Sequence, residues 1–181
     1  MGCDAWLAKQ LAEGNPDAMD RLIHRHGERL RRTIGQLTAW GPDVDDLLQE
    51  TLIRAWKYAS HFRSDGSLEK WLVSIAYRVC RDHHRGVRRM LFNLQQFWKH
   101  VSIESGFDTK RETERSESEQ WDRMQTAMQK LSPGDREILV MIHLEHWSHE
   151  ELAEQLRLSV ETLHVRLHRA KSRLKKWIDA S

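Results

Sequence analysis

Hydrophobic residues recur along this chain at steps of three and four positions, the spacing that aligns side chains on one face of an α-helix. Such stripes predict helices over residues 5–13, 17–40, 43–59, 68–85, 121–131, 133–146, 149–156 and 160–177. Alternating β-branched stretches, which are typical of strands, are missing, and the chain has three prolines and nine glycines. We therefore predict an all-α fold.

Polar residues that can cap a helix stand at the starts of several stripes. Such side chains accept hydrogen bonds from the free N–H groups of the first turn. The expected single caps are Asp43, Ser67, Ser132 and Ser159. Ser148 and Glu151 have the spacing of a capping box, and Pro133 suits a first helical position.

The helical pattern weakens between residues 86 and 120. Residues 108–120 are polar and charged, which is typical of a linker. We therefore expect two small helical domains, residues 1–90 and 121–181, joined by a flexible linker over residues 91–120.

The charge of the chain is segregated rather than large. The formal net charge is +2, yet residues 78–89 hold five arginines against one acid, and residues 166–176 form a second basic run. Two separated basic helices indicate two contact points on one long polyanion. For either run taken alone, the alternative is a solvated helix face.

Cysteine usage and hydropathy indicate the compartment. Cys3 and Cys80, the only two cysteines, form neither a metal-binding spacing nor a disulfide framework, which favours a reducing cytoplasm. The N-terminal residues lack the pattern of a signal peptide, and no apolar run approaches a membrane span. We expect a cytoplasmic protein without membrane insertion.

The last two predicted helices have the arrangement of a helix-turn-helix. A short helix, a tight turn at Arg157-Leu158 and a second helix with a buried apolar stripe fit this motif. A left-handed backbone at Arg157, where glycine is common, costs about 1 kcal/mol. The alternative is a bundle helix whose charges are solvated.

In a helix-turn-helix the second helix enters the major groove, with early residues at base edges and later cations on phosphates. The residues expected to contact DNA are Ser159, Thr162, His164, Val165, Arg166, Arg169 and Arg173.

Residues 131–176 resemble domain four of the extracytoplasmic-function sigma factors of bacterial RNA polymerase. The matching features are the Leu-Ser-Pro opening followed by Arg136-Glu137, the stretch "S-x-E-E-L-A-E-x-L", Ser159-Val160 and "R-L-H-R-A". The resemblance implies that the last helix reads the minus-thirty-five promoter element.

The stretch "DVDDLLQETLIRAW" presents acids, an amide, an apolar residue and a base on its predicted outer face. This mixture suits a protein partner better than DNA. It resembles the polymerase-binding helix of sigma domain two, with Asp46, Gln49 and Glu50 on the family's "D-L-x-Q-E" motif. The resemblance implies that core RNA polymerase is contacted by Asp46, Gln49, Glu50, Ile53 and Arg54.

The following stretch, "HFRSDGSLEKWLVSIAYRVCRDHHRGVRR", places aromatic residues beside cations, which suits single-stranded nucleic acid. Trp71 is better explained as a core residue. The stretch resembles the promoter-melting segment of the family. The resemblance implies a base-capture loop made of Phe62, Arg63, Ser64, Asp65, Gly66 and Ser67. It also implies a helix face at the minus-ten element made of Tyr77, Arg78, Arg81 and Arg85.

Metal and enzyme chemistry find little support among the eleven histidines. His143, His146 and His149 are spaced by three, but the last falls beyond the predicted helix end. His164 and His168 lie on the face expected at DNA, and "HEELA" lacks the second histidine of a metalloprotease. We expect no metal, no cofactor and no catalytic residues.

The resemblance therefore implies a sigma factor whose partners are core RNA polymerase, promoter DNA and an anti-sigma factor. The alternative is a helix-turn-helix regulator that binds palindromic DNA independently of polymerase.

Overall fold

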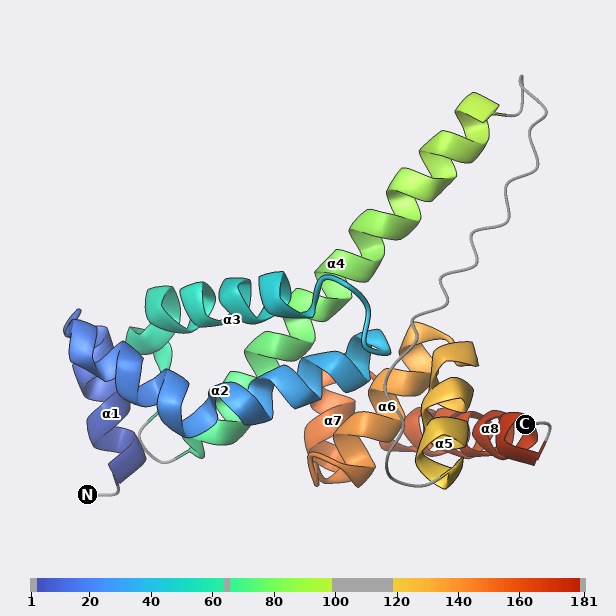
Figure 1. Cartoon of the computed structure of the whole chain (residues 1–181). Coiled ribbons are helices and arrows are strands. Elements are labelled where there is room, and N and C mark those ends of the chain that lie inside the picture. Colours follow the sequence, from blue (N-terminus) through green and yellow to red (C-terminus); the bar gives the residue numbers. More distant parts are fainter. Residues whose placement is uncertain (1–2, 64–65, 99–118, 180–181) are drawn as a thin grey trace.

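The computed structural model describes residues 3–63, 66–98 and 119–179, with the backbone alone for residues 3, 91–98 and 119–123. The first part contains α1 (Cys3–Ala12), α2 (Pro16–Thr38), α3 (Val44–Tyr58), a short 3₁₀ helix η1 (Ala59–His61) and α4 (Leu68–Trp98). The second contains α5 (Glu119–Lys130), α6 (Pro133–His143), α7 (His149–Leu156) and α8 (Val160–Asp179). The described residues form no strand, so the all-α prediction is confirmed (Figure 1).

Most of the predicted caps form. The hydroxyl oxygens of Ser67, Ser132 and Ser159 each accept a hydrogen bond from a backbone N–H three residues later. Ser148 and Glu151 make both hydrogen bonds of the capping box. The prediction for Asp43 is wrong, because its side chain makes no capping hydrogen bond. Its carboxylate instead lies 3.3 Å from the His83 ring, which joins the start of α3 to α4.

Helix α4 is longer than its apolar pattern predicted. It does not end at Arg85 but continues to Trp98, and it projects beyond the other helices (Figure 1). Apolar spacing reports only the packed part of a helix, whereas backbone hydrogen bonds can extend it further. Of the linker expected at residues 91–120, residues 99–118 lie outside the described residues.

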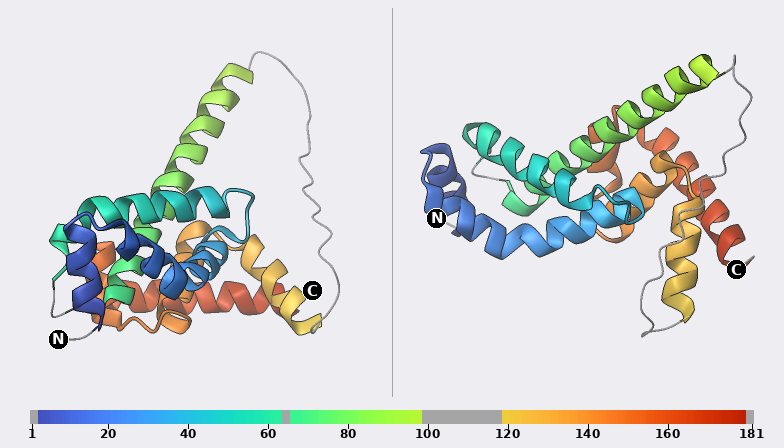
Figure 2. Two further views of the ribbon diagram at one scale, coloured as in Figure 1. Left: turned by 60° about the vertical axis from the view of Figure 1, so that its left-hand side comes forward. Right: turned by 45° about the horizontal axis from the view of Figure 1, so that its top comes forward.

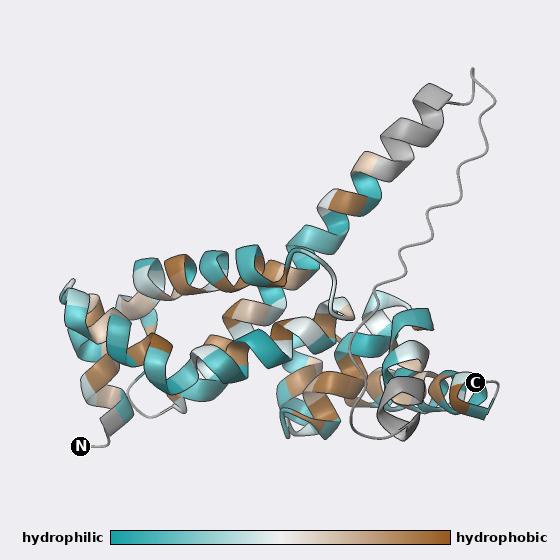
Figure 3. Ribbon diagram, viewed as in Figure 1, coloured by the Kyte–Doolittle hydropathy of each residue, from teal (hydrophilic) through white to brown (hydrophobic). Residues whose placement is uncertain are grey.

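The N-terminal half, α1 to α4, is a helical bundle in which α2, α3 and α4 pack pairwise. Its core includes the fully buried Leu22, Ile34, Leu37 and Leu72. In the C-terminal half, α5 to α8, both α6 and α7 pack against α8 around Met141, Leu152 and Leu163. Hydrophobic residues recur among hydrophilic ones along the ribbons of α2 and α3 (Figure 3). The amphipathic spacing of the sequence thus becomes two helical bundles.

The two halves lie against each other, with α2 packed on α6 (Figure 2). Their buried apolar residues form one continuous cluster. Polar contacts also join them: Thr33 of α2 donates a hydrogen bond to the buried carboxylate of Glu145, and Arg29 approaches the same carboxylate at 3.1 Å. The sequence predicted two bundles but not their contact.

Candidate nucleic-acid and polymerase interfaces

The outer face of α3 has the composition that the sequence predicted. Val44, Leu47, Thr51 and Ala55 are buried. Asp46, Gln49 and Ile53 are exposed, and Ile53 keeps 55% of its surface accessible. An exposed isoleucine among acids and an amide provides an apolar contact within a polar rim, as protein interfaces do.

Arg54, which the resemblance placed at the polymerase, is engaged within the chain. Its guanidinium donates to Glu50 at 2.7 Å and to Asp82 of α4 at 3.1 Å. The hydrogen bond to Glu50 is the main cause of a raised Arg54 pKa. Arg54 therefore fixes the Glu50 carboxylate and ties α3 to α4.

The segment before α4 brings an aromatic ring against a tryptophan. The rings of Phe62 and Trp71 meet edge to face with centroids 5.6 Å apart, and both side chains are half-buried. Arg63 and Gly66 are exposed and joined by a backbone hydrogen bond, while Ser67 caps α4. Ser64 and Asp65 lie outside the described residues. Trp71 packs against the core, in line with its interpretation as a core residue.

The resemblance implied that Tyr77 lies on the helix face at the minus-ten element. In the structure Tyr77 is instead buried, with 1% of its surface exposed. Its hydroxyl donates to Glu137 of α6 at 3.4 Å. Burial, followed by the nearby Glu137 charge, raises the pKa of Tyr77 to about 12. In this arrangement Tyr77 contacts the C-terminal half and cannot contact DNA.

Four cations follow Ser67 along one face of α4: Lys70, Arg78, Arg81 and Arg85. This cationic face of α4 lines a polar cleft of about 1000 Å³ whose opposite wall is α7. Two contacts cross the cleft. Lys70 Nζ binds both carboxylate oxygens of Glu151 at 2.6 and 2.8 Å, and Arg78 donates to Gln155 at 3.4 Å.

Helices α7 and α8 form the predicted helix-turn-helix. Arg157 adopts the left-handed conformation, with φ 57° and ψ 49°, and ends α7. Leu152, Leu163 and Leu167 are buried between the helices and their neighbours. The capping box fixes the start of α7 and Ser159 fixes the start of α8, so local hydrogen bonds set the angle of the turn.

The early part of α8 is open to solvent. Thr162, His164, Val165, Arg166 and Arg169 are all exposed. The Thr162 hydroxyl lies 3.0 Å from that of Ser159, and the His164 ring meets His149 edge to face with centroids 4.6 Å apart. Within the described part of the chain, Arg166 and Arg169 form no ion pair.

Arg173 differs from these two arginines. It forms an ion pair with Asp135 at 2.6 Å, and the Asp135 side chain is 12% exposed. Arg173 therefore joins α8 to the start of α6, and its charge is already partly neutralised.

Sequence reasoning missed three buried charged residues between the halves. Arg136 donates to the carbonyl oxygens of Met128, Gln129 and Leu131, and to that of Leu37 in α2. Burial lowers the pKa of Arg136 and raises the pKa of Glu137. Glu145 is the third of these residues, with 8% of its surface exposed. The apolar pattern of a sequence cannot identify such residues. It marks a helix face as buried only when the residues on that face are apolar.

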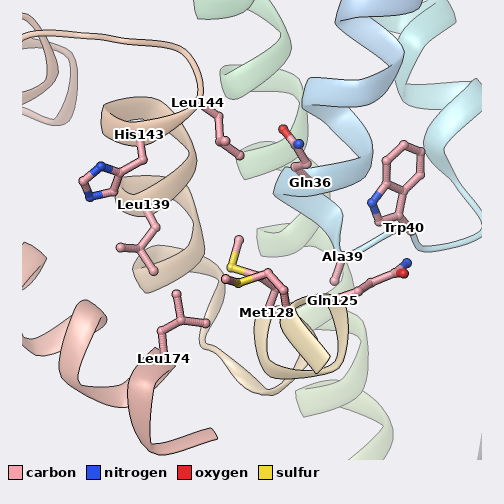
Figure 4. Close-up of a pocket in the computed structure, with 10 residues that line it drawn as sticks. Gln36, Ala39, Trp40, Gln125, Met128, Leu139, His143, Leu144 and Leu174 are labelled. Atoms are coloured by element: carbon pink, nitrogen blue, oxygen red, sulfur yellow. The ribbon is translucent and has the colours of Figure 1, made fainter. Parts of the chain in front are cut away.

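An apolar cavity of about 350 Å³ lies where the end of α2 meets α5, α6 and α8. Met128, Leu139 and Leu174 point toward one another at its centre (Figure 4). Trp40, at φ 55°, forms part of the wall. Its indole lies so close to Gly35 that a Cβ there would come within 2.5 Å of it.

Within the described residues, no group of three His, Cys, Asp or Glu side chains is placed to hold a metal ion. None of the described helices combines the length and apolar character that crossing a membrane requires.

Comparison with known proteins identifies both halves. Residues 22–90 match the family model described as Sigma-70 region 2, and residues 121–174 match Sigma-70, region 4. The chain is 30% identical to the RNA polymerase sigma factor CnrH of Cupriavidus metallidurans, over 98% of this chain and 95% of the relative. It is 29% identical to the RNA polymerase sigma factor NccH of Alcaligenes xylosoxydans xylosoxydans, over 98% and 96% of the two chains.

Two solved structures share the fold. CnrH in complex with the cytosolic domain of CnrY aligns with a TM-score of 0.63 and 27% identity, over 99% of both chains. The sigma factor RpoE in complex with the anti-sigma factor NepR, from Bartonella quintana, aligns with a TM-score of 0.67 and 24% identity, over 88% of this chain and 96% of that one. The sequence and structural relationships agree: the chain belongs to the extracytoplasmic-function sigma factors of bacterial RNA polymerase.

Proposed function

We propose that this chain binds core RNA polymerase in the cytoplasm and directs it to promoters through two DNA contacts, without enzymatic activity of its own. The observation that supports this most is the presence of both sigma-70 regions in one chain, in the family's order. The exposed mixed face of α3 supports a polymerase contact, and the exposed start of α8 supports a promoter contact.

The proposed polymerase surface consists of Asp46, Gln49 and Ile53, with Glu50 held in place by Arg54. For the upstream promoter element we propose Val165, Arg166 and Arg169, positioned by the Ser159 cap and flanked by Thr162 and His164. For the minus-ten element we propose the segment 62–67 together with Arg78, Arg81 and Arg85.

We further propose control by an anti-sigma factor. The structural relative CnrH forms a complex with the cytosolic domain of CnrY. A protein that bound both halves of the present chain at once would hold them together.

The test is in vitro transcription with purified core polymerase and genomic DNA, followed by mapping of the start sites. We expect start sites that share two upstream elements and that disappear when either core polymerase or this chain is omitted. Tight binding to palindromic duplexes, with no effect on transcription by core polymerase, would instead support an independent regulator.

The polymerase surface has its own test. Asp46→Lys should weaken capture of core polymerase about tenfold, because reversing an interface charge replaces attraction with repulsion. Asp20→Lys, an exposed substitution on α2, is the matched control. Equal capture of core polymerase by both variants would remove α3 from the proposed interface.

A further inference from the structure

Two histidine rings meet on the helix-turn-helix, one from each of its helices. His149 is the first residue of α7, and His164 lies early in α8. Their ring centroids are 4.6 Å apart and the ring planes cross at 84°, which is an edge-to-face arrangement that aromatic rings prefer. His149 is half-buried, whereas His164 is exposed. The contact therefore joins a ring held by the protein to a ring that is open to solvent.

We propose that His149 is a positioning residue for promoter recognition, which holds the His164 ring in the orientation that reads a purine in the upstream promoter element. The inference rests on the proposed function, because it takes the start of α8 to lie at that element. An imidazole N–H of His164 donates a hydrogen bond to N7, the acceptor that both purines present in the major groove. His149 itself makes no contact with DNA and acts through His164.

The backbone that carries the two rings is fixed by local hydrogen bonds. Ser148 and Glu151 form the capping box at the start of α7, next to His149. The Ser159 hydroxyl accepts a hydrogen bond from the N–H of Thr162 and fixes the start of α8. Both rings therefore extend from ordered helix starts. A side chain that is already oriented loses less entropy when it binds, so the contact between the rings favours the base contact.

Two carboxylates beside the rings make a base edge a better ligand than a phosphate. Hydrogen bonds at the start of α7 are the main cause of a lowered Glu150 pKa, and the charges of His149 and His164 add to it. Hydrogen bonds at the start of α8 are the main cause of a lowered Glu161 pKa, and the charge of His164 adds to it. Both acids are exposed. Because their charges repel phosphates, this part of the motif suits a base, whereas Arg169 suits the backbone.

Base preference in the complex with core polymerase tests the proposal. Competition binding would compare promoters that carry a purine or a pyrimidine at each position of the upstream element. His164→Ala should reduce the preference for a purine at one position by about fivefold. His149→Ala should reduce it at the same position by about threefold, whereas His149→Phe keeps a ring at the contact and should retain it. His24→Ala, an exposed substitution on α2, is the matched control.

The double variant shows whether His149 acts through His164. In a His164→Ala background, His149→Ala should cause no further loss of preference, because the ring that it positions is already gone. An equal loss from His149→Ala with and without the His164 ring would overturn the proposal. So would an equal loss in His149→Phe and His149→Ala, because ring packing would then not be the cause.

Salt dependence separates a base contact from a phosphate contact. A residue that reads a base releases no counterion from the backbone, so His164→Ala should leave the slope of log binding constant against log salt unchanged. A slope reduced by roughly 0.9, the contribution of one phosphate, would show that His164 binds the backbone and would contradict the assignment.

Nuclear magnetic resonance of the free protein decides the ring contact without polymerase. His149→Ala should shift the ring-proton resonances of His164, because the current of the neighbouring ring is lost, and His24→Ala should not. If these resonances do not move, the rings do not meet and the inference fails while the proposed function stands. If they move but the wild-type complex with core polymerase shows no sequence preference in the upstream element, the proposed function fails and takes the inference with it.

Discussion

The two helices expected to contact promoter DNA differ in what faces their cations. On α8, Arg166 and Arg169 point into solvent at the start of a capped recognition helix. On α4, Arg78 is hydrogen-bonded to Gln155 across a cleft. The contrast shows that local sequence determines which residues share a helix face, whereas packing of a distant segment determines whether that face can be reached.

The largest expected effect is on stability, from a substitution of Arg136, which joins α5 and α6 to the end of α2. Arg136→Ala should lower the free energy of unfolding by about 2–4 kcal/mol, because it removes a buried guanidinium that donates four hydrogen bonds to backbone carbonyl groups. Urea denaturation followed by circular dichroism would measure it. Arg32→Ala, an exposed substitution on α2, should change stability by less than about 0.5 kcal/mol. A loss below about 1 kcal/mol for Arg136→Ala would contradict the role of Arg136 in holding the halves together.

The next largest effect is expected on promoter binding by the exposed early part of α8. Arg166→Ala should cost about 1–3 kcal/mol on the cognate upstream element and relax the preference at one base position, because an early arginine can bind a guanine edge. Competition binding of the polymerase complex to promoter variants would measure both quantities. Equal weakening on every sequence would show that Arg166 contacts only phosphate.

A smaller effect should distinguish two arginines of α8 by how much each contributes to the salt dependence of DNA binding. Arg169→Ala should reduce the slope of log binding constant against log salt by roughly 0.9, the contribution of one phosphate contact. Arg173→Ala should reduce it less, because Arg173 is already paired with Asp135. Titrations of both variants at several salt concentrations would show it, and equal slopes would mean that the Asp135 pair opens on DNA.

The smallest expected effect is a pH dependence of folding stability that arises from the ion pair between Lys70 of α4 and Glu151 of α7. Hydrogen bonds from Lys70 and then from the Ser148 backbone lower the pKa of Glu151 in the folded protein. The stability gained is therefore present above the ordinary pKa of 4.5 and is lost as the pH falls through the lowered value. Because Glu151 is partly exposed, the gain is below about 1 kcal/mol. Glu151→Gln should remove this part of the acid-induced loss in urea denaturation at a series of pH values. An unchanged pH profile would indicate that the Lys70 pair does not form in solution.

Helix positions and most helix starts could be predicted because their causes are local. Apolar spacing identified the packed faces, and Ser67, Ser132, Ser148 and Ser159 marked helix starts through short-range hydrogen bonds. The left-handed turn at Arg157 also followed from the spacing of its two helices.

The arrangement of the halves could not be predicted, because it depends on residues far apart in the sequence. Tyr77 looked like a DNA contact until Glu137, sixty positions later, was found against its hydroxyl. Arg173, which is expected to contact a phosphate, is paired with Asp135, thirty-eight positions earlier. Asp43 failed as a cap, and its carboxylate lies beside His83 of α4 instead. In each case the folded chain provides a tertiary partner that the local sequence does not reveal.

The central claim, that this chain reads promoters only as part of the polymerase, is tested most directly by footprinting one mapped promoter with and without core polymerase. Permanganate reactivity would report unpaired thymines, and nuclease protection would report bound duplex. We predict protection of two upstream elements and reactive thymines at the minus-ten element only when this chain and core polymerase are both present. The same protection by the chain alone, or no reactive thymines in the complete mixture, would contradict the account.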